Sequence, residues 1–257
     1  MPPDQLRAPI RKALGPVFPN ARLAYRAVRW RRRLRDPRRV ARAQRFVVAA
    51  GPFRGLKLSR EAMILDMSFV PKLLGAYEAE LHQSIETAIA CEPDTIVNVG
   101  AGDGYYAAGL ARRLPSALVI AYDLHPSARR ATRNLARANG VYDRLSLKGE
   151  CRRGDLAYLD ERTFLVMDCE GAEGELLGTE TLGCANLIVE LHEHLRPGVT
   201  EAVSGRFAGT HDVRVVFGGR RDPAAHPGAA VLPAGRRQQA VQEPRRARPA
   251  WAIITRR

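Results

Sequence analysis

The sequence predicts an α/β protein built on a mostly parallel, seven-stranded sheet with helices on both faces. Short runs of valine, isoleucine and leucine recur along the chain, and helix-like segments separate most of them. Strands that alternate with helices in this way form parallel sheets, because each crossover needs about the length of a helix. A chain of 257 residues with 46% hydrophobic content can bury one such core.

The N-terminal part, residues 1–60, is predicted to be a basic extension, and residues 61–257 to be the sheet domain. Phe46 to Leu58 predicts a short strand pair that turns at Gly51. Ser59 to Cys91 is predicted to be mostly helical, because its apolar residues recur every three or four positions.

The remaining elements follow in order along the chain. Strands are expected at residues 94–99, 117–122, 144–148, 163–167, 186–191, 211–217 and 251–255. Helices are expected at Tyr105 to Arg113 and at Ser127 to Asn139, between the first three strands. Residues 218–250 are rich in glycine, proline, alanine and arginine, and this composition predicts a long mobile loop.

Three glycines, Gly100, Gly102 and Gly104, follow the first strand and precede a helix. Glycines permit a tight turn and a close approach of backbone to a ligand, so the segment is typical of a nucleoside-binding site; a turn without a ligand is the alternative. The spacing differs from the dinucleotide fingerprint G-x-G-x-x-G, and Asp103 would repel a pyrophosphate. That carboxylate would tolerate the ammonium group of S-adenosylmethionine, which carries no phosphate.

Asp123 ends the second predicted strand, 23 positions after Gly100. A carboxylate there can accept hydrogen bonds from both hydroxyls of a ribose. The glycine turn and Asp123 together therefore predict S-adenosylmethionine as the cofactor.

Polar residues also follow the later parallel strands, and the carboxyl ends of parallel strands meet at one edge of the sheet. That edge is where open α/β sheets bind their ligands, so we expect the active site there. The residues concerned are Glu150, Asp168, Cys169, Glu170, Glu190, His192, Glu193 and His194.

The glycine motif and Asp123 resemble motifs I and II of the class I S-adenosylmethionine-dependent methyltransferases. The segment Phe164-Leu-Val-Met-Asp-Cys-Glu-Gly-Ala-Glu173 is similar to the fourth-strand motif of the FkbM-type members, in which Glu-Gly follows an Asp after one residue. The resemblance covers residues 75–215 and implies the Rossmann-like class I methyltransferase fold. The chain departs from motif I at Asn98, where an acidic residue is commoner.

The resemblance assigns the cofactor-binding roles residue by residue. The backbone of Gly100, Ala101, Gly102 and Gly104 would cradle the methionine and ribose portions, and Asp123 would hold the ribose hydroxyls. Asn98 would accept a hydrogen bond from the ammonium group, and Glu150 would lie near the adenine. Tyr77 and Glu78 are expected to close over the methionine end, with an ordinary helix surface as the alternative.

The catalytic residues are expected to be Asp168, Glu190 and His192. Asp168 stands where the family places a residue beside the methyl group. Methyl transfer to a hydroxyl requires loss of its proton, and a histidine near neutral pKa is the usual base. The less favoured alternative is that the three residues hold one divalent metal ion, which would lower the pKa of a bound hydroxyl. His194 is the weaker candidate for the base.

The charge is concentrated in the two ends of the chain. Residues 1–60 hold seventeen Lys and Arg against two acidic residues, whereas residues 61–218 have a net charge of −8. The stretch Arg22 to Arg45 is therefore a candidate surface for nucleic acid or an anionic membrane face, and a solvated extension is the alternative. The four cysteines form no C-x-x-C pair and no long apolar run is present, so we expect a cytoplasmic protein with reduced thiols.

The sequence predicts an S-adenosylmethionine-dependent O-methyltransferase of FkbM type with a small-molecule acceptor, either a sugar or a secondary metabolite. Two alternatives remain at this point. The first is an RNA methyltransferase that grips phosphates with its basic ends. The second is a non-catalytic binding module that retains the methyltransferase fold.

Overall fold

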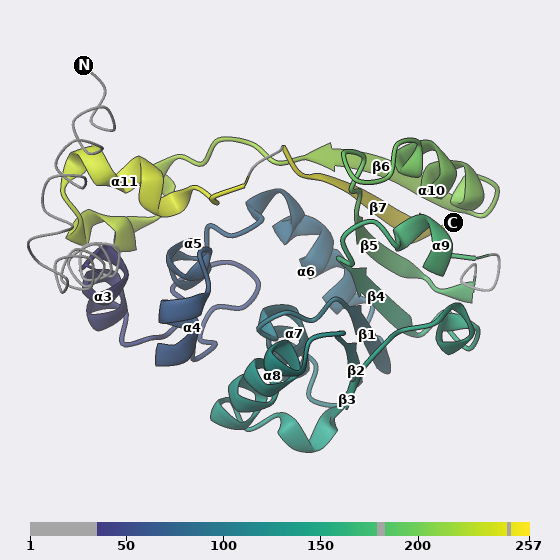
Figure 1. Cartoon of the computed structure of the whole chain (residues 1–257), viewed down its shortest axis with the longest axis horizontal. Coiled ribbons are helices and arrows are strands. Elements are labelled where there is room, and N and C mark those ends of the chain that lie inside the picture. The colour runs from purple at the N-terminus through teal and green to yellow at the C-terminus, as the bar shows by residue number, and fades with distance from the viewer. Residues whose placement is uncertain (1–34, 179–182, 246–247) are drawn as a thin grey trace, which may run out of the picture.

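The computed structural model describes residues 35–178, 183–245 and 248–257, and its sheet has the order β3-β2-β1-β4-β5-β7-β6 (Figure 1). All neighbours pair in parallel except β7, which runs antiparallel between β5 and β6. The strands are β1 (Thr95–Val99), β2 (Leu118–Tyr122), β3 (Leu145–Lys148), β4 (Thr163–Met167), β5 (Asn186–Glu190), β6 (His211–Phe217) and β7 (Ala250–Arg256). The prediction of a Rossmann-like class I methyltransferase fold is confirmed by this topology.

The strand bodies separate two apolar clusters because successive side chains of a strand point to opposite faces. On β4, Phe164 and Val166 join one cluster, whereas Leu165 and Met167 join the other. Helices α6 (His82–Ala90), α7 (Tyr105–Arg113) and α8 (Pro126–Ala138) pack into the first cluster, and α10 (Val199–Phe207) packs into the second. The short helix α9 (Glu173–Leu176) lies beside α10 (Figure 1).

A group of helices stands apart from the sheet, and we call it the cap (Figure 1). It brings together two segments from opposite ends of the chain, because α3 contacts α5 and η6, and α11 contacts α5. Its elements are α3 (Arg35–Ala43), α4 (Arg60–Leu65), α5 (Phe69–Leu74), η5 (Pro223–Ala225), η6 (Pro227–Val231) and α11 (Ala234–Val241). Further short 3₁₀ helices are η1 (Ala79–Leu81), η2 (Tyr142–Arg144) and η3 (Arg153–Leu156).

Two sequence expectations for the cap need correction. Residues 218–250, expected as a long loop, contain η5, η6 and α11, and Arg236 in α11 forms a 2.6 Å ion pair with Asp36 in α3. The expected strand pair over Phe46 to Leu58 is reduced to one isolated antiparallel bridge, between Val47 and Lys57. The Arg-rich stretch lies mostly outside the described residues, which begin at α3.

The expected helical region before the sheet is present, but it is broken into α4, α5, η1 and α6. The chain bends between α5 and η1 at Gly75 and Glu78, which both have positive φ angles. Within the described ranges, no helix is long and apolar enough to cross a membrane.

The order of the sheet reverses between β1 and β4, since β2 and β3 lie on one side and β5 on the other. Such a switch point leaves a crevice outside the carboxyl ends of the two central strands. The glycine turn after β1 and Asp168 after β4 both lie at this point.

Candidate active site

The glycine turn after β1 has left-handed backbone angles and is fixed against the ends of β2 and β4. Gly100, Gly102 and Gly104 all have left-handed φ angles, of 78°, 56° and 88°. The N–H groups of Gly100 and Ala101 both donate to the carbonyl of Tyr122 at 2.9 Å, which ties the turn to the end of β2. A Cβ atom on Gly100 would lie 1.6 Å from the carbonyl oxygen of Asp168, so the turn and the end of β4 fit together only with glycine there.

Asp123 lies beside this turn, as its position in the sequence predicts. One carboxylate oxygen accepts a 2.8 Å hydrogen bond from the N–H of Gly102, and the other accepts a 2.8 Å bond from the N–H of His125. Each oxygen keeps a further lone pair for a ligand hydroxyl. A Cβ atom on Gly102 would meet nothing within 4 Å, so open space lies above the turn next to Asp123.

The two other predicted cofactor residues differ in their surroundings. Asn98 on β1 is buried, and its side-chain oxygen has no hydrogen-bond partner among the described residues. A ligand ammonium would satisfy that acceptor. Glu150 is exposed and pairs with Arg152 at 3.0 Å, so its contact with adenine stays a prediction.

Asp103, which the sequence suggested would tolerate a ligand's ammonium group, already has a cationic partner in the protein. The buried Lys72 of α5 lies 3.0 Å from the Asp103 carboxylate and 3.1 Å from that of Asp66. Burial alone would lower the pKa of Lys72, but the two carboxylates outweigh it and raise that pKa. The same ammonium faces the rings of Tyr77 and Tyr105, at 4.9 and 5.3 Å from their centroids. The protein's own lysine therefore neutralises the acidic residue of the turn.

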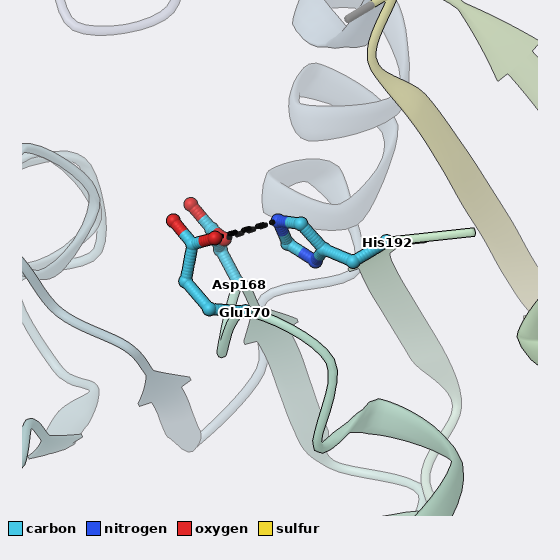
Figure 2. Close-up of side chains that lie close together, drawn as sticks. All are labelled: Asp168, Glu170 and His192. Atoms are coloured by element: carbon cyan, nitrogen blue, oxygen red, sulfur yellow. Dashed lines mark ion pairs between the residues drawn. The ribbon is translucent and has the colours of Figure 1, made fainter. Parts of the chain in front are cut away.

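A second group of side chains gathers where β4 and β5 end (Figure 2). The Nε2 atom of His192 lies 3.6 Å from Asp168 Oδ1 and 3.6 Å from Glu170 Oε2. One ligand atom from each of the three residues lies within 4.8 Å of the other two. The predicted convergence of Asp168 and His192 is therefore present, and Glu170 joins them. These three residues, which we call the strand-end cluster, could hold a divalent metal ion.

The other ring nitrogen of His192 is held by a residue that the sequence interpretation did not assign to the site. Nδ1 lies 2.7 Å from a carboxylate oxygen of Glu173, which is completely buried at the start of α9. Burial lowers the pKa of His192, but the hydrogen bond and charge of Glu173, with Asp168 and Glu170, more than offset this and raise it. The only sequence signal for Glu173 is that it ends the segment Phe164 to Glu173.

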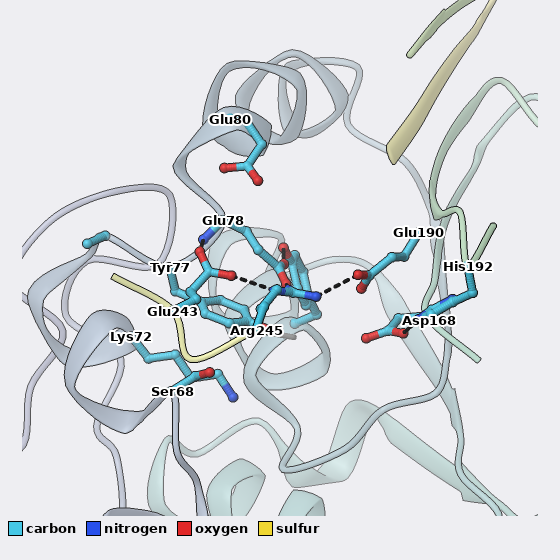
Figure 3. A network of polar contacts seen from close by, with 12 residues as sticks. Ser68, Lys72, Tyr77, Glu78, Glu80, Asp168, Glu190, His192, Glu243 and Arg245 are labelled. Carbon is cyan, nitrogen blue, oxygen red and sulfur yellow. Dashed lines mark hydrogen bonds and ion pairs between the residues drawn. The ribbon is translucent and has the colours of Figure 1, made fainter. Parts of the chain in front are cut away.

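That Glu190 shares a site with His192 stays a prediction: Glu190 interacts with Asp168, and Asp168 in turn faces His192. Glu190 is buried at the end of β5 and forms a 2.5 Å ion pair with Arg245 (Figure 3). Burial, and then the charge of Asp168, raise the pKa of Glu190. His194 is exposed and lies 5.8 Å from His192 between ring centroids, outside the cluster.

Arg245 comes from the segment between β6 and β7 and joins buried carboxylates from three parts of the chain (Figure 3). It pairs with Glu78, with Glu190 and, at 2.7 Å, with Glu243. Burial raises the pKa of Glu78 to about 7, Arg245 opposes that rise and Glu243 adds to it. Nothing in the sequence around Arg245 distinguishes it from the many other arginines.

A cavity of about 540 Å³ opens beside Arg245, where β6 ends and β7 begins. Four arginines line it together with one acidic residue, Glu243, and the arginines are Arg220, Arg221, Arg245 and Arg248. Arg245 thus borders the cavity and also contacts Glu190 at the sheet edge. The cavity has the size of a small-molecule site, and two of its arginines, Arg221 and Arg245, already pair with carboxylates of the protein.

No family model matches the chain, and no curated protein matches it in sequence. Among solved structures it is similar to a methyltransferase from Geobacter sulfurreducens, with 17% identity over 68% of this chain and 76% of that one (TM-score 0.45). It is also similar to the O-methyltransferase TomG from Streptomyces achromogenes in complex with SAM, with 12% identity over 87% and 89% (TM-score 0.47). An rRNA methylase from Streptococcus thermophilus shares 14% identity over 70% and 98% (TM-score 0.49). At such identities a shared activity does not follow.

Proposed function

We propose that the protein is an S-adenosylmethionine-dependent methyltransferase of FkbM type that methylates an oxygen of a small molecule, such as a sugar or a secondary metabolite. The observation that carries this proposal is the closed turn at Gly100 to Gly104, joined by a 2.8 Å hydrogen bond to Asp123 at the switch point of the sheet. The strand-end cluster lies on the neighbouring strand ends, where an acceptor would meet the methyl group.

The donor side of the site fits the cofactor. The turn offers bare backbone and open space above Gly102, and Asp123 offers acceptor lone pairs to the ribose hydroxyls. The unpartnered oxygen of Asn98 suits the ammonium group. When bound, S-adenosylmethionine supplies an electrophilic methyl group on a positively charged sulfur.

The acceptor side must position a hydroxyl and promote loss of its proton. Asp168 and His192 are placed for this, since Glu173 fixes the His192 ring and turns Nε2 toward Asp168. Glu190 has a supporting role, because its carboxylate holds Arg245. Holding two reactants in line is worth up to roughly 7–11 kcal/mol of the barrier in favourable cases.

The arginine-lined cavity favours a small acceptor with an acidic group. Its volume of about 540 Å³ suits a small metabolite, and Arg220 and Arg248 in its lining would pair with a carboxylate or phosphate. Arg245 links this cavity to the sheet edge, so an acid held there would place the rest of the acceptor near the strand-end cluster.

The proposal is tested by calorimetric titration with S-adenosylmethionine in buffer that contains EDTA. We expect binding of one cofactor, and we expect Asp123→Ala to weaken it by at least roughly tenfold through loss of hydrogen bonds to a charged acceptor. Asp143→Ala, an exposed carboxylate in η2, is the matched control and should bind like the wild type. Absence of binding at millimolar cofactor would overturn the proposal.

A further inference from the structure

The three side chains of the strand-end cluster are spaced as if around a common centre (Figure 2). His192 Nε2 lies 3.6 Å from an oxygen of Asp168 and 3.6 Å from an oxygen of Glu170. Ligands that bind one divalent cation at about 2.0–2.3 Å lie about 3–4 Å from one another. The present spacing therefore leaves room for a cation that all three atoms could bind with little movement.

The buried histidine points an unpartnered nitrogen into this centre. The side chain of His192 is only 6% exposed, and Nδ1 is occupied by Glu173 at 2.7 Å. Nε2 makes no hydrogen bond to the described residues, since both nearby carboxylate oxygens lie beyond hydrogen-bond distance. In the neutral ring with Nδ1–H donating to Glu173, Nε2 carries a lone pair and faces two further acceptors. Three acceptor atoms that face one point form a set that a cation can satisfy.

Asp168 supports the same conclusion independently. Its Oδ1 atom, the one that faces His192, is buried and has no hydrogen-bond partner in the described part of the chain. A proton on Nε2 would leave at least one of the two carboxylates unsatisfied and would not bring either to hydrogen-bond distance. A cation would satisfy both.

The local charge also favours a cation. Three carboxylates, those of Asp168, Glu170 and Glu173, face His192, and none of them forms an ion pair with a lysine or arginine among the described residues. Glu173 holds the ring of His192 by hydrogen bonding to its other nitrogen, which is the usual arrangement of a carboxylate behind a metal-bound histidine.

We infer that Asp168, Glu170 and His192 bind one divalent cation of the first transition series, such as Mn²⁺ or Zn²⁺, with Glu173 as the positioning residue for His192. Two carboxylates and an imidazole suit these ions better than Ca²⁺ or Mg²⁺, which prefer oxygen ligands alone. Asp168 and Glu170 are partly exposed, so free positions on the cation would be open to water or to an acceptor oxygen.

The consequence for methyl transfer rests on the proposed function. An acceptor hydroxyl bound to the cation would have a lowered pKa and would release its proton to water. The oxygen would then form a bond to the methyl carbon, and the carbon–sulfur bond would break with its electron pair left on sulfur. His192 would then serve as a ligand rather than as the base.

The test is a titration of the EDTA-treated, dialysed protein with Mn²⁺, followed by electron paramagnetic resonance of the free ion. We expect one Mn²⁺ per chain at micromolar affinity and a loss of at least roughly a hundredfold in Asp168→Asn, Glu170→Gln and His192→Gln. Glu173→Gln should weaken binding by about 10–100-fold without removing a ligand. Zn²⁺ should displace Mn²⁺ from the same site, because it stands higher in the affinity order of divalent ions.

Two matched controls come from the same surface. His194 and Glu175 are exposed neighbours of the cluster, so His194→Gln and Glu175→Gln should bind Mn²⁺ like the wild type. The Glu170 side chain is 78% exposed, so Glu170→Gln reports on the site even if a buried variant fails to fold. Wild-type protein that binds neither ion below millimolar concentration would overturn the inference, and so would Asp168, Glu170 and His192 variants that bind normally.

The cation inference and the proposed function can fail independently of each other. Cofactor binding is measured in EDTA and cation binding without cofactor. Binding of S-adenosylmethionine without binding of Mn²⁺ or Zn²⁺ would remove the cation and leave the methyltransferase proposal standing. Binding of a cation without binding of the cofactor would remove the methyltransferase proposal and leave the cation site standing.

Discussion

At Gly100 the chain passes so close to the end of β4 that no side chain fits. A Cβ atom there would lie 1.6 Å from the Asp168 carbonyl oxygen, and the residue also has a φ of 78°. Gly102 has a left-handed φ as well, but open space surrounds it. A side chain at Gly100 would therefore meet both an unfavourable backbone conformation and a clash, whereas a side chain at Gly102 would meet only the unfavourable conformation.

We expect Gly100→Ala to lower the free energy of unfolding by about 3–4 kcal/mol, since about 1–2 kcal/mol comes from the left-handed backbone and the rest from overpacking. Gly102→Ala should lower the free energy of unfolding only by the roughly 1–2 kcal/mol of the left-handed backbone, because no clash occurs there. Urea denaturation of both variants checks this. Equal losses would show that the turn moves away from β4 at little cost.

Glu78 provides a pH dependence whose sign follows from its pKa. The folded-state pKa of about 7 lies above the ordinary value of 4.5. Between these values the folded protein holds a proton that the unfolded chain has lost, so stability falls as pH rises from about 4.5 to 7 and then levels off.

We expect the Glu78 contribution to fall by up to about 3 kcal/mol across this range, at 1.36 kcal/mol for each unit of pKa shift. Denaturant titrations at pH 5 and pH 7.5 measure it. Glu78→Gln should reduce the dependence, the rest of which includes Glu190, whose pKa is raised to about 9 by burial, whereas Glu92→Gln, an exposed carboxylate, should leave it unchanged. The idea fails if the wild type and Glu78→Gln vary equally with pH.

At the scale of elements, the sheet could be predicted from the sequence, but the cap could not. The bounds of β4 and β6 match the expected ranges, because dense runs of aliphatic residues between polar ones are a local signal. The segment 218–250 carries no such signal. Its structure depends on contacts to distant residues, as in the pair between Arg221 and Glu80.

The candidate site likewise has residues that could be predicted from the sequence and residues that could not. Asp123, Asp168 and His192 could be placed because each follows a recognisable strand. Lys72 and Arg245 could not, because each acts through partners that only folding brings near, and arginine is common throughout the chain.

Arg221 tests how the cap is joined to the rest of the molecule. It is buried, pairs with Glu80 and with Glu243, and donates to the carbonyl of Ala76 at 3.0 Å. Arg221→Ala would leave the Glu80 carboxylate without its ion pair and would remove one of the two ion pairs of Glu243, so we expect the free energy of unfolding to fall by about 3–5 kcal/mol.

The matched control is the adjacent, exposed Arg220, and Arg220→Ala should change stability by less than about 0.5 kcal/mol. Thermal unfolding of both variants gives the comparison. Hydrogen exchange should show the loss of protection in α11 first. Similar stabilities for the two variants would mean that these ion pairs do not hold the cap.

For the whole molecule, the distribution of charge bears on whether the acceptor is a small molecule or RNA. The net charge of +14 belongs to the two ends, while residues 61–218 are acidic. A protein that grips several phosphates loses about 10³–10⁵ in affinity between 50 and 200 mM salt.

We expect methylation of a metabolite pool with labelled cofactor to change little over this range of salt. An RNA pool serves as the parallel acceptor. Label that enters RNA, with a steep loss on addition of salt, would contradict the small-molecule proposal and favour the RNA alternative.

The position of β7 has a consequence for how the chain is made. β7 follows β5 and β6 in sequence but lies between them, and it is the sheet neighbour through which β6 is attached. While the chain is being synthesised, β5 therefore presents a bare edge, and β6 and the cap segment after it leave the ribosome before their partner strand exists. An unpaired edge is a template for association with other chains. The nascent protein is thus most open to misassembly until β7 has paired with both strands.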